Sequence, residues 1–149
     1  MEKRILGNSG LRVSRLGLGT MTWGRDTDEH EAADQLKTFL DAGGNLIDTA
    51  AMYGDGDSER VIGGFIGTLA KREDLIIATK AGISVSTGER TVNNSRTNLL
   101  GDLDKSLSRL GVDYIDLWQI HTWDPMVPLE ETLSAIDQAV SSGRVRYVG

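Results

Sequence analysis

Short apolar runs alternate along this chain with longer segments whose apolar residues recur at helical spacing. The apolar runs occupy residues 16–19, 46–47, 75–79, 114–120 and 145–148. The helical stripes between them cover residues 32–40, 61–69, 99–110 and 133–140. Alternation of strands with helices predicts a parallel α/β sheet whose helices pack outside it. The chain would then hold four βα units and the start of a fifth.

Two architectures are compatible with this alternation. A doubly wound open sheet can be built from five strands, whereas a (β/α)8 TIM barrel needs eight strands and about 250 residues. On pattern alone, the open sheet fits the 149 residues better. Ahead of the first unit, residues 3–6 and 11–15 flank a turn that contains Gly10, which predicts a β-hairpin. We therefore expect one domain over 1–149, with a hairpin at 1–15 and βα units at 16–149.

The composition excludes several classes of function. The chain has no cysteine, which rules out disulfides, thiol catalysis and zinc sites built on thiolates. The net charge is −6 and no run of Lys or Arg occurs, so we expect no nucleic-acid partner. No Asp, Glu and His cluster has metal-ligand spacing, and no metal is expected. Neither a signal-peptide core nor a membrane-length apolar run is present, which predicts a cytoplasmic protein without membrane contact.

Polar residues or glycine stand where four of the predicted strands end. Gly19 and Thr20 follow the first strand, Asp48 ends the second, Lys80 ends the third and His121 ends the fourth. The carboxyl ends of parallel strands meet on one rim, where ligands and catalytic groups gather. We therefore expect these side chains to lie close together.

Each candidate also has a structural interpretation. Asp48 could cap its loop, and Tyr53 in the same loop could pack on the rim. Lys80 could be a solvated surface lysine, although the apolar run before it favours a half-buried ammonium group. His121 could be a hydrogen-bonded core histidine. The other histidine, His30, is expected on the surface of the first helix.

Taken together, these residue types suit proton transfer at a carbonyl group. A tyrosine phenol ionises near pH 10 in water, and an ammonium group beside it lowers its pKa. With Lys80 beside it, Tyr53 could act as a general acid, while Asp48 would hold the lysine in place. A neutral His121 could orient a carbonyl oxygen. Such a site suits reduction of a C=O bond, with the hydride coming from a cofactor.

These motifs resemble those of the aldo-keto reductase family, and the resemblance runs from end to end. The segments that carry it are 16–21, 45–50, 53–59, 78–80, 106–117, 119–121 and 143–149. The Tyr-Gly-x-Gly-x-Ser-Glu form at 53–59 is similar to the bacterial and potassium-channel β-subunit-like branches.

The resemblance implies a (β/α)8 TIM barrel closed at its base by the N-terminal hairpin. This chain would supply the first four βα units and the start of strand five, so the motifs favour the barrel over the open sheet. The implied activity is NADPH-dependent reduction of an aldehyde or ketone to an alcohol. The family's general acid matches Tyr53, its lysine Lys80, its aspartate Asp48 and its carbonyl-orienting histidine His121.

Further positions follow from the same resemblance. Gly19, Thr20 and Met21, with Asp48, match positions near the nicotinamide and its ribose. The substrate pocket would be formed by Trp23, Tyr53, His121 and Trp123. For the two tryptophans the alternative is packing within a lid over the pocket.

The end of the chain leaves the function open. The chain stops at Gly149, inside the predicted fifth strand, ahead of the family's nicotinamide-amide and adenosine contacts. The leading expectation is the N-terminal half of an NADP-dependent enzyme with a small-molecule carbonyl substrate. The alternatives are a half-barrel that self-associates into a homo-oligomer and a non-catalytic, NADPH-binding regulatory subunit. For the isolated chain we expect weak or no cofactor binding.

Overall fold

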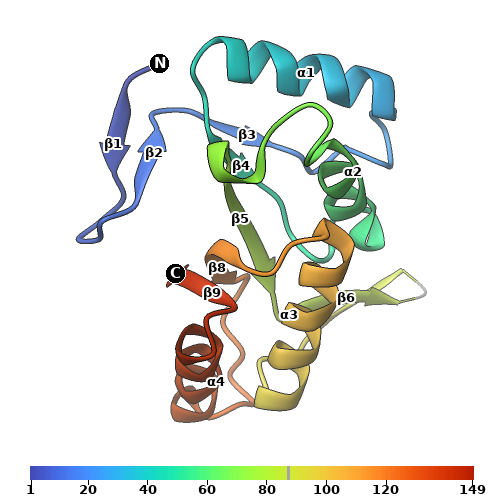
Figure 1. Ribbon diagram of the computed structural model, residues 1–149. Coiled ribbons are helices and arrows are strands. Elements are labelled where there is room, and N and C mark those ends of the chain that lie inside the picture. Colours follow the sequence, from blue (N-terminus) through green and yellow to red (C-terminus); the bar gives the residue numbers. More distant parts are fainter. Residues whose placement is uncertain (87) are drawn as a thin grey trace.

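A five-stranded parallel sheet forms the centre of the computed structural model, which describes residues 1–86 and 88–149 (Figure 1). Its strands are β3 (Gly17–Gly19), β4 (Leu46–Asp48), β5 (Ile76–Ala81), β8 (Ile115–Ile120) and β9 (Val145–Val148). They lie in the order β3-β4-β5-β8-β9, so each pairs with the next strand of the sheet along the chain. A doubly wound sheet reverses direction at a switch point, whereas a barrel adds its strands in sequence. The open sheet that the length favoured is therefore wrong, and the arc of a barrel is confirmed.

Four helices follow one another around the outer side of this arc (Figure 1). They are α1 (Glu29–Asp41), α2 (Asp57–Phe65), α3 (Arg96–Leu110) and α4 (Leu129–Ser141). Asp28 caps the amino end of α1, because its carboxylate accepts a hydrogen bond from the Glu31 amide at 2.9 Å. Gly111 ends α3 in a left-handed conformation with φ of 64°, which glycine adopts without steric cost.

The second helix is shorter than its apolar stripe suggested. It ends at Phe65, and the following Ile66 is extended, with ψ of 126°. Ile66 and Leu69 were expected on the helix face but lie beyond its end. Both still pack against the core, which explains why an apolar pattern at helical spacing overstated the helix.

Apolar residues cover both faces of the sheet. Ile47 and Ile77 point outward and are buried among the helices. On the inner face, Ala78 and Leu117 are buried with residues of the N-terminal hairpin. That hairpin consists of β1 (Lys3–Ile5) and β2 (Arg12–Ser14), as predicted, and it lies on the side of the sheet opposite the helices (Figure 1).

A second hairpin was not anticipated from the sequence. Strands β6 (Ile83–Ser86) and β7 (Glu89–Val92) pair antiparallel directly after β5. The residues of β7 are all exposed, so no apolar alternation marks this strand. Two short 3₁₀ turns, η1 (Tyr53–Gly56) and η2 (Arg72–Asp74), complete the elements.

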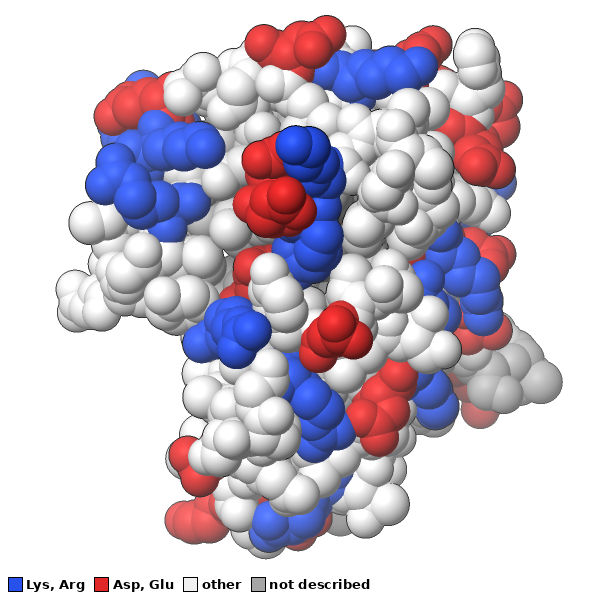
Figure 2. Space-filling model, in the orientation of Figure 1, with Lys and Arg blue, Asp and Glu red and all other residues white. Residues whose placement is uncertain are grey.

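The surface carries charges of both signs. Acidic and basic side chains are interspersed over the face that Figure 2 shows. Within the part of the chain that the structure describes, every helix is too short or too polar to cross a bilayer.

Candidate active site

The strand ends place three of the predicted residues on one rim. Asp48 is the last residue of β4, Lys80 lies one residue before the end of β5, and His121 directly follows β8. Side chains alternate between the two faces of a strand. Because Ile47 and Ile77 face the helices, Asp48 and Lys80 project from the inner face.

An ion pair holds Lys80 in place. Its Nζ lies 2.9 Å from each carboxylate oxygen of Asp48 and 2.7 Å from the carbonyl oxygen of Thr49. An ammonium group has three protons to donate, so these contacts use all of them. The Lys80 side chain is 15% exposed, which fits the half-buried ammonium group and not a solvated surface lysine.

Tyr53 and His121 complete the cluster. The Lys80 ammonium lies 5.2 Å from the centre of the Tyr53 ring. The ring centres of Tyr53 and His121 are 6.0 Å apart, with an interplanar angle of 84°. Four residues from three different strand ends and one loop are thus brought together, as the strand-end pattern predicted.

The surroundings of His121 favour a neutral imidazole. Burial lowers the pKa of His121 below its ordinary value of 6.5, and the positive charges of Lys80 and Arg90 lower it further. Asp48 opposes this shift with the smallest effect. The Nδ1 atom is buried and has no hydrogen-bond partner among the described residues. His30, in contrast, lies on the surface as expected, with a side chain 90% exposed.

The positions expected near a nicotinamide divide into two groups. Gly19 pairs with Asp48 in the sheet register, and the space beside its Cα is open. Met21 is exposed on the same rim. Thr20 is fully buried instead, and its hydroxyl lies 3.1 Å from the Asp48 carbonyl oxygen and 2.8 Å from the Ser58 hydroxyl. The Thr20 side chain is therefore part of the buried hydrogen-bond network next to Asp48 and is not available to a ligand.

The two tryptophans also differ. Trp23 is fully buried, its Nε1 donates a hydrogen bond to Gln35 at 2.8 Å, and its ring packs edge-on against Phe65. Trp23 therefore packs in the core between α1 and α2. Trp123 is 64% exposed and lines a groove of about 340 Å³ beside Ile120 and Leu133.

Comparison with known proteins identifies the family of this chain. Residues 15–149 match the model of the family described as "Aldo/keto reductase family". This chain belongs to the aldo/keto reductase family. The chain is 37% identical over 154 residues to an aldo-keto reductase of Bacillus subtilis, covering 100% of the chain and 46% of that protein. It is 38% identical over 150 residues to a putative voltage-gated potassium channel subunit beta of Schizosaccharomyces pombe, covering 98% of the chain and 44% of that protein.

A solved aldo-keto reductase supports the same fold. The holo form of such an enzyme from Bacillus halodurans superposes with a TM-score of 0.91 at 37% identity, covering 100% of this chain and 49% of that one. The chain thus spans about half the length of these relatives, and its arc corresponds to part of a (β/α)8 barrel.

Sequence reasoning missed a buried polar layer directly beneath the cluster. The Ser58 hydroxyl donates to the carbonyl oxygen of Thr20 at 2.8 Å and lies 2.9 Å from the Thr49 hydroxyl. Glu59 is 0% exposed, with one oxygen 2.6 Å from Thr79 Oγ1 and the other 2.6 Å from Arg109 Nε. Glu59 precedes the buried Ile62 by three residues, and that spacing on one helix face was the available signal.

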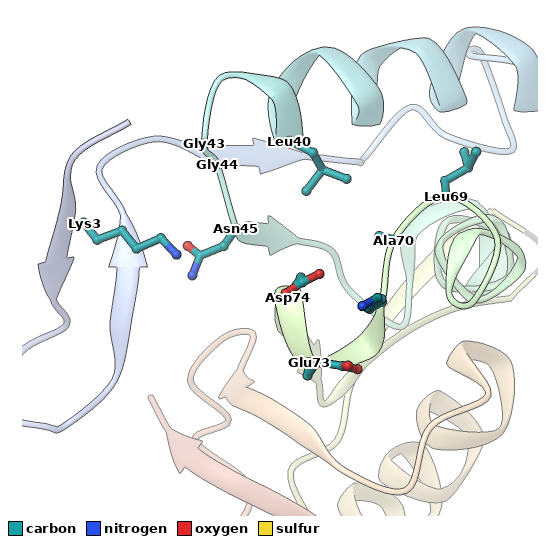
Figure 3. A pocket seen from close by; sticks show the side chains of 10 residues that line it. Lys3, Leu40, Gly43, Gly44, Asn45, Leu69, Ala70, Glu73 and Asp74 are labelled. Carbon is teal, nitrogen blue, oxygen red and sulfur yellow. The ribbon is translucent and has the colours of Figure 1, made fainter.

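The base of the sheet carries a separate cavity of about 530 Å³ (Figure 3). Its lining includes Lys3, Asn45, Glu73 and Asp74. Asn45 directly precedes β4, so this cavity lies at the amino ends of the strands. The polar cluster lies at their carboxyl ends, and the two sites are distinct.

Proposed function

We propose that the protein to which this chain belongs reduces an aldehyde or ketone to an alcohol with NADPH, and that Tyr53 is its general acid. The observation that carries the proposal is the position of Tyr53 between Lys80 and His121. Its ring centre lies 5.2 Å from the Lys80 ammonium and 6.0 Å from the His121 ring. A phenol beside a fixed ammonium group and an imidazole is suited to deliver a proton to a carbonyl oxygen.

The rim fits the nicotinamide end of such a cofactor. Gly19 leaves open space, Met21 is exposed, and the Asp48 side chain is 41% exposed beside them. A relative solved in its holo form supports a bound cofactor. When bound, the cofactor would supply the hydride.

The chain's own residues would then handle the proton and the developing charge. Tyr53 donates its phenolic proton to the carbonyl oxygen as that oxygen gains negative charge. His121, neutral because its pKa is lowered, donates a hydrogen bond that orients the same oxygen. Lys80 keeps a positive charge beside the phenol, and Asp48 fixes the lysine with two contacts of 2.9 Å. The exposed Trp123 would wall the substrate pocket.

A regulatory subunit that binds NADPH without turnover is the second candidate. The observation that favours it is the 38% identity to a protein named as a putative potassium channel subunit beta. Both candidates share the cofactor, so binding cannot separate them. Turnover of simple aldehydes by the full-length protein, followed by NADPH absorbance, separates them directly.

Replacing Tyr53 tests the proposed acid. In the full-length protein, Tyr53→Phe removes the proton donor and should lower kcat for carbonyl reduction by about 10²–10⁴-fold, with an unchanged circular dichroism spectrum. Tyr114→Phe is the matched control, because Tyr114 lies just before β8, at the amino end of that strand, with its ring between Arg72 and Arg146. Full turnover in Tyr53→Phe would rule out this assignment.

A further inference from the structure

We propose that the buried Glu59–Arg109 ion pair, together with Thr79, positions Tyr53 and Lys80 relative to each other. Glu59, Arg109 and Thr79 are positioning residues in this proposal, since none of them belongs to the polar cluster on the rim. The inference rests on the proposed function for its kinetic consequence. Its structural consequence can be measured without any activity.

The pair is placed where it contributes little to stability by itself. Glu59 is fully buried, and the Arg109 side chain is 15% exposed. Removing two charges from water offsets most of their mutual attraction, so apolar residues of similar volume would stabilise a core at least as well. Both Glu59 oxygens are nevertheless satisfied, by Thr79 and Arg109 at 2.6 Å each. An ion pair that is fully hydrogen-bonded in this way fixes one geometry.

The turn that carries Tyr53 is built against Arg109. Gly56, the last residue of that turn, has φ of 89°, and a Cβ there would lie 2.5 Å from the Arg109 Cδ. A Cβ on Gly63 of α2 would lie 2.5 Å from the Arg109 carbonyl oxygen. Glycine at both positions allows the turn and the helix to approach Arg109 closely.

The same contacts reach the strand that carries Lys80. Thr79 immediately precedes Lys80 on β5, and the pleat directs the two side chains to opposite faces. Thr79 points outward to Glu59, while Lys80 points inward to Asp48. Glu59 lies six residues after Tyr53 along the chain. One carboxylate therefore links the β5 residue beside Lys80 to the helix that follows the Tyr53 turn.

Loosening this link should widen the distribution of distances between Tyr53 and Lys80. Small displacements of reacting groups reduce turnover strongly, while substrate binding is made by other contacts. We therefore expect a fall in kcat with KM nearly unchanged.

The test uses substitutions at Thr79 in the full-length protein. Thr79→Val keeps the side-chain shape but removes the donor to Glu59, and should lower kcat about tenfold with KM within about twofold. Thr79→Ser restores the donor and should recover most of kcat. Glu59→Gln should lower kcat at least as much as Thr79→Val, because it also weakens the contact with Arg109.

Asp116→Asn supplies the matched control. Asp116 forms another largely buried ion pair, with Arg72, and its carboxylate accepts the Ile77 amide at 2.9 Å near the amino end of β5. Asp116→Asn should lower Tm to a similar extent and leave kcat unchanged. If Thr79→Val and Glu59→Gln lower Tm but likewise leave kcat unchanged, the pair is only structural and the inference is overturned.

Hydrogen exchange separates this inference from the proposed function. Thr79→Val should accelerate amide exchange at residues 53–56, whereas Asp116→Asn should not. Absence of turnover in the unsubstituted protein would refute the reductase proposal, and the exchange result would still decide this one. Unchanged exchange at 53–56 in Thr79→Val overturns the positioning role.

Discussion

The chemistry of His121 depends on charges that come from three other elements. Lys80 from β5 and Arg90 from β7 lower its pKa, together with burial, while Asp48 from β4 raises it. A neutral imidazole can donate to a carbonyl oxygen without adding a charge to the site. The protonation state of this one residue therefore reflects the assembled rim and not its neighbours in sequence.

The lowered pKa of His121 predicts how stability depends on pH. Below pH 6.5 the unfolded chain takes up a proton at this histidine before the folded chain does, so the free energy of unfolding should fall as the pH drops through and below that value. His121→Gln should flatten this part of the curve, measured by urea denaturation at a series of pH values. His30→Gln is the control, since the His30 side chain is 90% exposed. An unchanged slope in His121→Gln would contradict the prediction.

At the scale of elements, α2 is held closely against α3. Two adjacent glycines, Gly63 and Gly64, lie in this helix but face different surroundings. A Cβ on Gly63 would lie 2.5 Å from the Arg109 carbonyl oxygen and 3.0 Å from that of Leu110, whereas a Cβ on Gly64 would meet nothing within 4 Å. Helix propensity alone would treat the two positions alike.

Alanine at these two positions should therefore have opposite effects. Gly63→Ala forces two backbones apart and should lower the free energy of unfolding by about 1–3 kcal/mol. Gly64→Ala removes backbone freedom from the unfolded chain and should raise it by about 0.5 kcal/mol. Chemical denaturation of both variants provides the measurement. Equal changes in the free energy of unfolding at the two sites would show that Gly63 does not lie in close contact with the backbone of α3.

The whole molecule consists of a curved sheet between two apolar layers. The outer layer joins the sheet to the helices, and the smaller inner layer joins it to the β1–β2 hairpin. The hairpin thus covers the inner face near the base of the arc, at the opposite end from Asp48 and Lys80. Strands β3 and β9 are the two edges of this sheet, and self-association through them stays a prediction.

The role of the hairpin can be tested by two substitutions within it. Leu11 is 6% exposed in the inner layer, so Leu11→Ala should lower the free energy of unfolding by about 2–4 kcal/mol. Ile5 is 58% exposed in the same hairpin, and Ile5→Ala should change it by less than about 0.5 kcal/mol. If Leu11→Ala is as mild as Ile5→Ala in thermal and urea unfolding, the hairpin is not part of the core.

Much of the fold could be predicted because its signals are local. Periodicity of two or 3.6 residues lies within each element, and glycine or an Asp cap lies at its end. Strand ends were therefore placed to within a few residues, and with them Asp48, Lys80 and His121. Strand β7 was missed because its residues are exposed and show no apolar alternation. The length of α2 was overestimated because apolar residues continue at helical spacing beyond its end at Phe65.

By itself, the sequence determined the alternation of strands and helices and the set of polar residues at the strand ends. Only the tertiary structure decided that Trp23 is buried, that a second hairpin follows β5, and that Glu59 meets an arginine fifty residues away. The physical reason is distance along the chain. Local periodicity depends on adjacent residues, whereas burial and ion pairing depend on which segments pack together.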